Sequence, residues 1–127
     1  MQIEIPVSFG ELVDKITILE IKCARIADPD RQALAQAELE LLQGILAGIA
    51  PPDGYDAMKA ELSRVNEVLW DIEDRIRAMD ADGNFGNDFV NCAQSVYRQN
   101  DLRFRIKTRL SHAAGSQVEE VKSYLGR

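Results

Sequence analysis

Apolar residues recur along most of this chain at alternating spacings of three and four, the pattern of helices that bury one face. The first helix is predicted to begin at the capping box Ser8-Phe9-Gly10-Glu11 and to end before Asp28-Pro29. Its apolar seam comprises Phe9, Leu12, Ile16, Leu19, Cys23 and Ile26. A second helix is expected over about 29–49, before a turn rich in proline and glycine.

The third helix carries a heptad pattern, which is the most regular on the chain. Its seam comprises Tyr55, Met58, Leu62, Val65, Leu69, Ile72, Ile76 and Met79. A fourth helix is expected from about Asp88 to Ala113, with Gly115 ending it. Four amphipathic helices with short connections predict an all-α fold, an antiparallel four-helix bundle forming a single domain over residues 1–127.

Two further elements are expected at the ends of the chain. Residues 2–7 alternate polar and apolar side chains, which predicts a short extended N-terminal segment. A second capping box, Ser116 to Glu119, predicts a short C-terminal helix that continues through Tyr124.

The apolar seam of the fourth helix is interrupted by polar residues. Ala93 and Val96 begin this seam and Leu110 closes it, but Asn100, Arg103 and Lys107 lie between them within a narrow arc of the helix. An alternative seam through Tyr97 and Phe104 moves Arg103 to the edge and leaves the other two near the interior. An unpartnered buried polar group costs about 1–3 kcal/mol, so these three side chains must have partners.

Two interpretations of the interruption remain open. In one, Arg103 and Lys107, helped by Lys15 or Lys22 of the first helix, bind an anion in an interhelical pocket, because arginine and lysine suit carboxylates and phosphates. Asn100 and Glu20 would orient the ligand. In the other, the same cations form an internal salt-bridge network, paired to Glu20 or Glu73.

Composition narrows the classes of function. The chain has 127 residues and a net charge of −6, which argues against a dedicated nucleic-acid-binding protein. The opening residues do not resemble a signal peptide, and no apolar run is long enough to span a bilayer, so a cytoplasmic location is expected. Cys23 and Cys92 are expected to be reduced, buried thiols. With one histidine and no cysteine pair, no metal or cofactor is expected.

Other chemistries receive less support from the residues. Four acids crowd one stretch of the third helix, but the second helix lacks the matching acid pairs that helical magnesium-dependent pyrophosphohydrolases require. Neither a phosphate-binding glycine loop nor a GxSxG motif is present. An enzyme would use Glu20 or Asp101 as its acid–base group, with Arg103 stabilising charge.

Three motifs, IEIPVSFGELVDKITILEIK, SVYRQNDLRFRIK and GSQVEEVKSY, resemble a family of small bacterial proteins of unknown function. The matching motif positions are Lys15, Thr17, Glu20, Lys22, Tyr97, Asn100, Asp101, Arg103, Lys107, Glu120, Lys122, Ser123 and Tyr124. Members of that family accompany glycosyltransferase-like and surface-polysaccharide genes, so the resemblance implies a ligand of the sugar-phosphate or nucleotide-sugar type. The first helix is also weakly similar to that of helical chorismate mutases, but the arginines of that motif are missing from the second helix.

The sequence therefore favours a protein that binds a small anionic ligand. The candidate binding residues are Asn100, Arg103, Lys107, Lys15, Glu20, Lys22, Tyr97 and Asp101. The alternatives are an enzyme or a dimeric interaction module, in which the second and third helices form the dimer and the basic stretch 98–109 engages an acidic partner. A two-fold homodimer is also expected because residues 41–50 carry no charge, and Trp70 lies off the heptad seam. The terminal segments could cover these surfaces instead.

Overall fold

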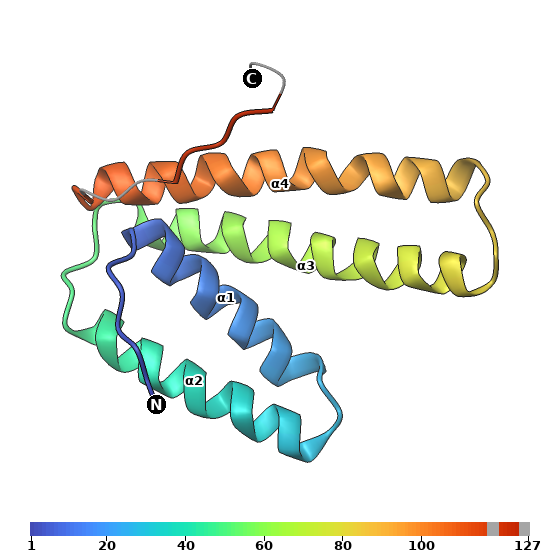
Figure 1. Ribbon diagram of the computed structural model, residues 1–127. Helices are drawn as coiled ribbons and strands as arrows, with labels where there is room; N and C mark the ends of the chain where they lie inside the picture. Colours follow the sequence, from blue (N-terminus) through green and yellow to red (C-terminus); the bar gives the residue numbers. More distant parts are fainter. Residues whose placement is uncertain (117–119, 125–127) are drawn as a thin grey trace.

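The computed structural model describes residues 1–116 and 120–124 and confirms the all-helical, four-helix architecture. The helices are α1 (Phe9–Arg25), α2 (Pro29–Ala47), α3 (Tyr55–Ala81) and α4 (Asn87–Ala113). They form two hairpins, α1 with α2 and α3 with α4, and the first hairpin is inclined to the second (Figure 1). The α3–α4 hairpin extends well beyond α1 and α2 (Figure 1). Within the described part of the chain, no helix is long and apolar enough to cross a membrane.

Local sequence signals account for where the helices begin. The Ser8 hydroxyl accepts a hydrogen bond from the backbone N–H of Glu11 at 3.1 Å, as the first capping box predicts. Asp28 caps α2 by accepting from the N–H of Asp30 at 3.1 Å, and Pro29 opens that helix.

The helix α1 is the centre of the structure because it packs against all three other helices. Nine of its 17 residues are buried, whereas only two residues of α2 are. Two apolar clusters lie on either side of α1. One joins α1 to α3 and α4 and contains Phe9, Val13, Met58, Leu62, Val65, Ile106 and Leu110. The other joins α1 to α2 and contains Leu12, Ile16, Leu19, Ala35 and Leu39.

The start of α1 approaches α4 closely. A Cβ added to Gly10 would overlap the backbone carbonyl of Lys107, so only glycine fits there. The N–H of Gly10 donates to the hydroxyl of Ser111, and the N–H of Phe9 donates to the hydroxyl of Ser116, both at 3.0 Å. Ser111 in the last turn of α4 and Ser116 just beyond its end thus satisfy free donors at the start of α1.

The predicted C-terminal helix is wrong for the residues that can be described. Residues 120–124 are not helical and cross α4 in an extended form, and residues 117–119 lie outside the described part. The Ser116 hydroxyl accepts from Phe9 of α1. The capping residue of the predicted helix is therefore used by a helix at the opposite end of the chain.

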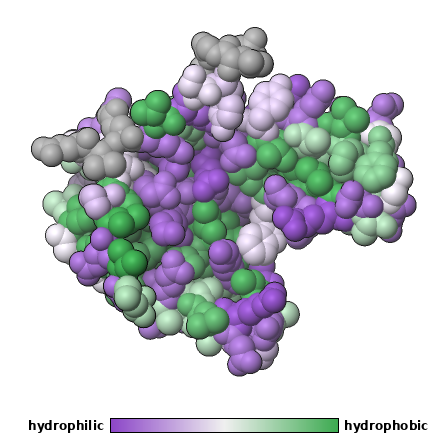
Figure 2. Space-filling model, in the orientation of Figure 1, coloured by the Kyte–Doolittle hydropathy of each residue, from purple (hydrophilic) through white to green (hydrophobic). Residues whose placement is uncertain are grey.

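The heptad seam of α3 is confirmed, because all eight of its residues are buried or half-buried. The seam assigned to the first half of α4 is wrong at Ala93, which is exposed. The alternative seam is wrong at Tyr97, which is 57% exposed. The reason is the projection of the α3–α4 hairpin beyond α1, so the first half of α4 faces α3 alone. The space-filling view shows a notch in the outline between this projection and the α1–α2 hairpin (Figure 2).

Candidate ligand-binding site

A buried carboxylate, Asp14 of α1, joins three helices. Its Oδ1 and Oδ2 accept from Nε and Nη2 of Arg103 on α4, at 2.9 and 2.5 Å. Its Oδ1 also accepts from Nδ2 of Asn66 on α3 at 3.0 Å. Asp14 is fully buried, and the paired hydrogen bonds hold the guanidinium plane in one orientation. The hydrogen bond to Asp14 is the main cause that raises the pKa of Arg103 above its ordinary value.

Thr17, one turn after Asp14, completes this network. Its hydroxyl donates to the backbone carbonyl of Asp14 at 2.8 Å and accepts from Nδ2 of Asn66 at 2.9 Å. In the described part of the chain, no buried side-chain nitrogen or oxygen lacks a hydrogen-bond partner. The network therefore holds Asp14, and through it Arg103, without an unsatisfied polar group in the core.

Lys107, one turn after Arg103, is 7% exposed and has carboxylates on two sides. Its Nζ lies 2.8 Å from Oε2 of Glu11 and 3.0 Å from Oε2 of Glu120, and 4.0 Å from Oδ2 of Asp14. Burial by itself lowers the pKa of Lys107, but the hydrogen bonds to Glu11 and Glu120 outweigh burial and the pKa is raised. Lys107 is therefore a paired ammonium ion at neutral pH.

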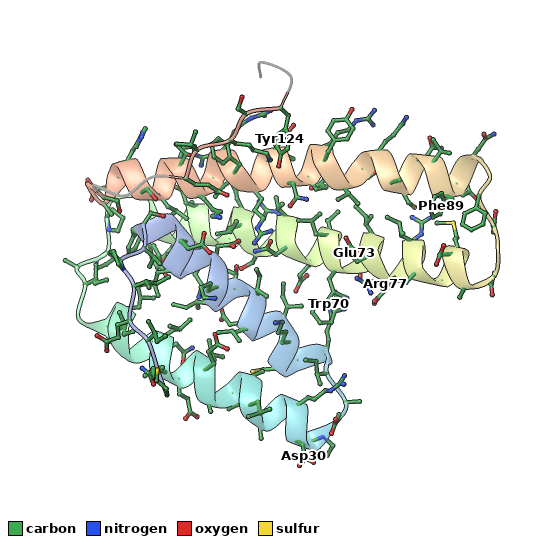
Figure 3. All side chains as sticks on the ribbon, in the orientation of Figure 1. Asp30, Trp70, Glu73, Arg77, Phe89 and Tyr124 are labelled. Carbon is green, nitrogen blue, oxygen red and sulfur yellow. The ribbon has the colours of Figure 1, made fainter. Side chains whose placement is uncertain are left out.

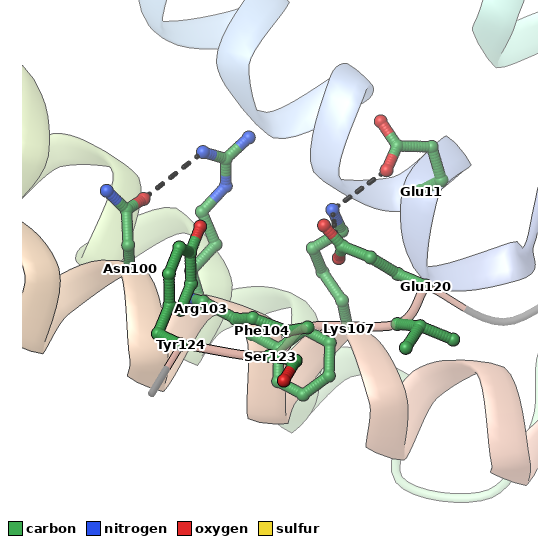
Figure 4. A pocket seen from close by; sticks show the side chains of 10 residues that line it. Glu11, Asn100, Arg103, Phe104, Lys107, Glu120, Ser123 and Tyr124 are labelled. Atoms are coloured by element: carbon green, nitrogen blue, oxygen red, sulfur yellow. Dashed lines mark hydrogen bonds and ion pairs between the residues drawn. The ribbon is translucent and has the colours of Figure 1, made fainter. Parts of the chain in front are cut away.

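A cavity of about 570 Å³ lies beside these ion pairs. The helix α4, the side chain of Glu11 and the extended residues 120–124 enclose it. Glu11 and Glu120 flank the Lys107 ammonium, and the side chains of Arg103 and Tyr124 border the same space (Figure 4). Three cations and two carboxylates line the cavity, together with Asn100, two aromatic rings and the hydroxyl of Ser123.

The segment 120–124 is tied to α4 by more than one contact. The Nζ of Lys122 lies 3.0 Å from Oδ1 of Asp101, and it lies over the rings of Phe104 and Tyr124 at 5.6 and 5.4 Å from their centres. Tyr124 consequently lies along the outer side of α4 (Figure 3). These contacts form the outer wall of the cavity from a segment without regular structure.

The part of Arg103 that Asp14 leaves free gives the cavity its chemical character. A guanidinium carries five N–H donors, and Asp14 takes one on Nε and one on Nη2. Among the described residues, the contact of Nη1 is a long one, 3.5 Å to Oδ1 of Asn100. Arg103 lines the cavity with 29% of its side chain exposed. An oriented arginine with donors to spare can bind a carboxylate or phosphate group.

The structure brings together part of the predicted site. Asn100, Arg103 and Lys107 all line the cavity, with Lys107 buried and the other two half-buried. Tyr97 and Asp101 line an adjoining cavity on the next face of α4.

Lys15, Glu20 and Lys22 line neither cavity. Lys15 is exposed, and Glu20 pairs with Lys59 of α3 at 3.2 Å. The expected pairing of Arg103 or Lys107 with Glu20 or Glu73 is wrong. Arg103 pairs with Asp14 and Lys107 pairs with Glu11, and both of these carboxylates belong to α1. Glu73 pairs with Arg77 on its own helix.

Sequence reasoning missed Asp14 because the polar residues of α1 that it assigned to the site were Lys15, Glu20 and Lys22. A second stripe was nevertheless present: Gly10, Asp14, Thr17 and Ile21 are spaced by four, three and four residues, and all are buried. Small and polar residues at helical spacing beside an apolar seam were the signal that pointed to a second buried face.

Comparison with known proteins places the chain in a family. The family described as "Family of unknown function (DUF6165)" matches residues 1–126. The chain belongs to this family. No curated protein and no solved structure matches it. The family match includes all the residues that line the cavity, so the site lies within the domain that defines the family and not in an added segment.

Proposed function

We propose that this protein binds a small anionic ligand of the sugar-phosphate or nucleotide-sugar type in the cavity beside Arg103. The observation that carries the proposal is the orientation of Arg103, which lines the cavity, by a fully buried carboxylate that takes only two of its five N–H donors. Asn100, Ser123 and the carboxylates of Glu11 and Glu120 supply partners for the hydroxyl groups of a sugar.

The carboxylate of Glu120 is the group with which an incoming phosphate competes. It pairs with Lys107, yet 49% of its side chain is exposed, on a segment without regular structure. Asp14 is buried and cannot leave Arg103 without a large cost. A bound anion would therefore displace Glu120 from Lys107 and leave the Asp14–Arg103 pair intact.

Titration with glucose 1-phosphate, followed by calorimetry, tests the proposal in wild type and in Arg103→Lys. Lysine keeps the charge but loses the planar fork, and we expect affinity to fall by about tenfold or more. The matched control is Arg25→Lys, because Arg25 has a similar exposed fraction, 34%, and a similar carboxylate partner, Asp71 at 2.5 Å. Equal affinity in Arg103→Lys and wild type, with both folded by circular dichroism, would contradict the proposal.

A second proposal, a two-fold homodimer formed through α2, is supported by a different observation. The helix α2 packs against α1 alone, and one of its faces leaves large apolar side chains in solvent. They are Leu34, Leu41 and Ile45, with exposed fractions of 73, 48 and 52%, and Ile49 just beyond the end of the helix is 38% exposed. The N-terminal segment does not remove the need for a partner, because Ile3 and Ile5 are themselves 75 and 71% exposed.

Light scattering tests the dimer. The chain mass is 14.2 kDa, so a dimer gives about twice that value. Leu41→Glu with Ile45→Glu places charge in the interface and should return the monomer mass, whereas a wild-type protein that is already monomeric would contradict the dimer. We also infer a cytoplasmic location, which is supported by Cys23 and Cys92 being free thiols.

A further inference from the structure

A second cavity, of about 680 Å³, adjoins the first along α4. The two share four lining residues: Asn100, Phe104, Lys122 and Tyr124. The second cavity adds the side chains of Val96, Tyr97, Asp101 and Arg105. Since the same four side chains border both spaces, the two cavities lie side by side along α4.

Helix geometry places the two cavities on adjacent faces of α4. At about 100° per residue, Asn100, Arg103 and Lys107 share one face, while Tyr97, Asp101 and Phe104 share the next. Tyr97 and Arg103 are six positions apart, a rise of about 9 Å along the helix. The two cavities are therefore offset along α4 as well as around it.

The chemistry of the second cavity differs from that of the first. Three aromatic rings line it, those of Tyr97, Phe104 and Tyr124, and Tyr97 is 57% exposed. Exposed aromatic faces suit stacking with a planar ring. Lys122 lies where the two cavities meet, with its ammonium over the rings of Phe104 and Tyr124. Tyr97 is therefore the ring that the second cavity adds to those of Phe104 and Tyr124, which border both cavities.

We infer that the ligand has two parts, a phosphate bound at Arg103 and a nucleobase stacked in the cavity of Tyr97 and Tyr124. The inference rests on the proposed function, since it assumes a phosphate at Arg103, and it selects the nucleotide class over simple sugar phosphates. Lys122 lies between the two parts and faces the linkage that joins them.

Two probes that differ only in the base test the inference: uridine 5′-monophosphate and ribose 5-phosphate. Calorimetric titration of the full chain should show the nucleotide binding about tenfold more tightly, which is the margin that one stacked base provides. Tyr97→Ala should remove most of this margin and leave the affinity for ribose 5-phosphate unchanged. Phe85→Ala is the matched control, since Phe85 is 58% exposed, lines neither cavity and lies between α3 and α4.

The outcomes separate the inference from the proposed function. Equal affinities for the two probes, or a margin that survives in Tyr97→Ala, would overturn the two-part ligand and leave phosphate binding at Arg103 standing. Absence of binding by both probes, or binding that is the same in Arg103→Lys, would overturn the proposed function and the inference with it.

Discussion

Replacing Asp14 with alanine should destabilise the protein more than any other change at the site. The substitution leaves the Arg103 guanidinium without its carboxylate and removes an acceptor of Asn66. Breaking a buried ion pair from one side costs about 3–5 kcal/mol. Because 29% of the Arg103 side chain remains in contact with water, we expect a loss of about 3 kcal/mol, at the lower end of that range.

Urea unfolding, followed by far-ultraviolet circular dichroism and by the fluorescence of the single tryptophan, measures this loss. In a domain of this size, about 3 kcal/mol lowers the melting temperature by about 12 °C. The informative comparison is the double variant Asp14→Leu with Arg103→Met. It removes both charges, and Asn66 can still donate to Thr17 at 2.9 Å, so its cost should be no more than about 1 kcal/mol.

A double variant that loses as much stability as Asp14→Ala, or more, would contradict this expectation. It would mean that the side chains of Asp14 and Arg103 act independently, in spite of their two hydrogen bonds. A loss below about 1 kcal/mol in Asp14→Ala would have the same meaning, because that is the range for exposed ion pairs.

Other expectations concern the packing and the charges around the site. Gly10→Ala should lower the free energy of unfolding by at least about 2 kcal/mol because its Cβ meets the backbone of Lys107. Gly44→Ala is the control, since a Cβ there has nothing within 4 Å, and it should stabilise α2 by about 0.5–1 kcal/mol. Equal shifts of the melting temperature in the two variants would contradict the close contact at Gly10. Lys107 has a raised pKa in the folded state, so the stability that its charge provides is complete below the unfolded value of about 10.5 and is lost as the pH rises through the folded value. The difference in unfolding free energy between wild type and Lys107→Met should therefore shrink above pH 10.5, and a difference that grows would show the opposite sign. Glu120→Gln should tighten glucose 1-phosphate binding about threefold because it removes the competing carboxylate, and a partly exposed ion pair contributes roughly 0.5–1 kcal/mol. Weaker binding of this variant by calorimetry would contradict the competition.

Periodicity along the sequence predicted α1 and α3 well because each of them buries a regular seam. The heptad of α3 is the clearest case, since α3 packs along its full length against α4. The same reasoning failed where burial depends on the number of neighbouring helices. The helix α1 packs against three helices and buries Asp14 beside its apolar seam.

Contacts between distant parts of the chain explain the other differences. The Ser116 hydroxyl caps α1, 107 positions away in the sequence, in place of the helix that its own capping box predicted. The acids that pair with Lys107 come from the start of α1 and from the C-terminal segment. The position of the cations could be predicted from α4 alone, but the identity of their partners depended on which turn of α1 lies against which turn of α4.

The most direct test of phosphate binding at Arg103 is the side-chain Nε–Hε resonance of this arginine, followed by nuclear magnetic resonance during titration with glucose 1-phosphate. The account predicts a saturable shift of the Arg103 signal, with the Arg25 signal unchanged as an internal control, since Arg25 lines neither cavity. An Arg103 signal that stays fixed at millimolar ligand, or that moves only as much as the Arg25 signal, would contradict binding at this site.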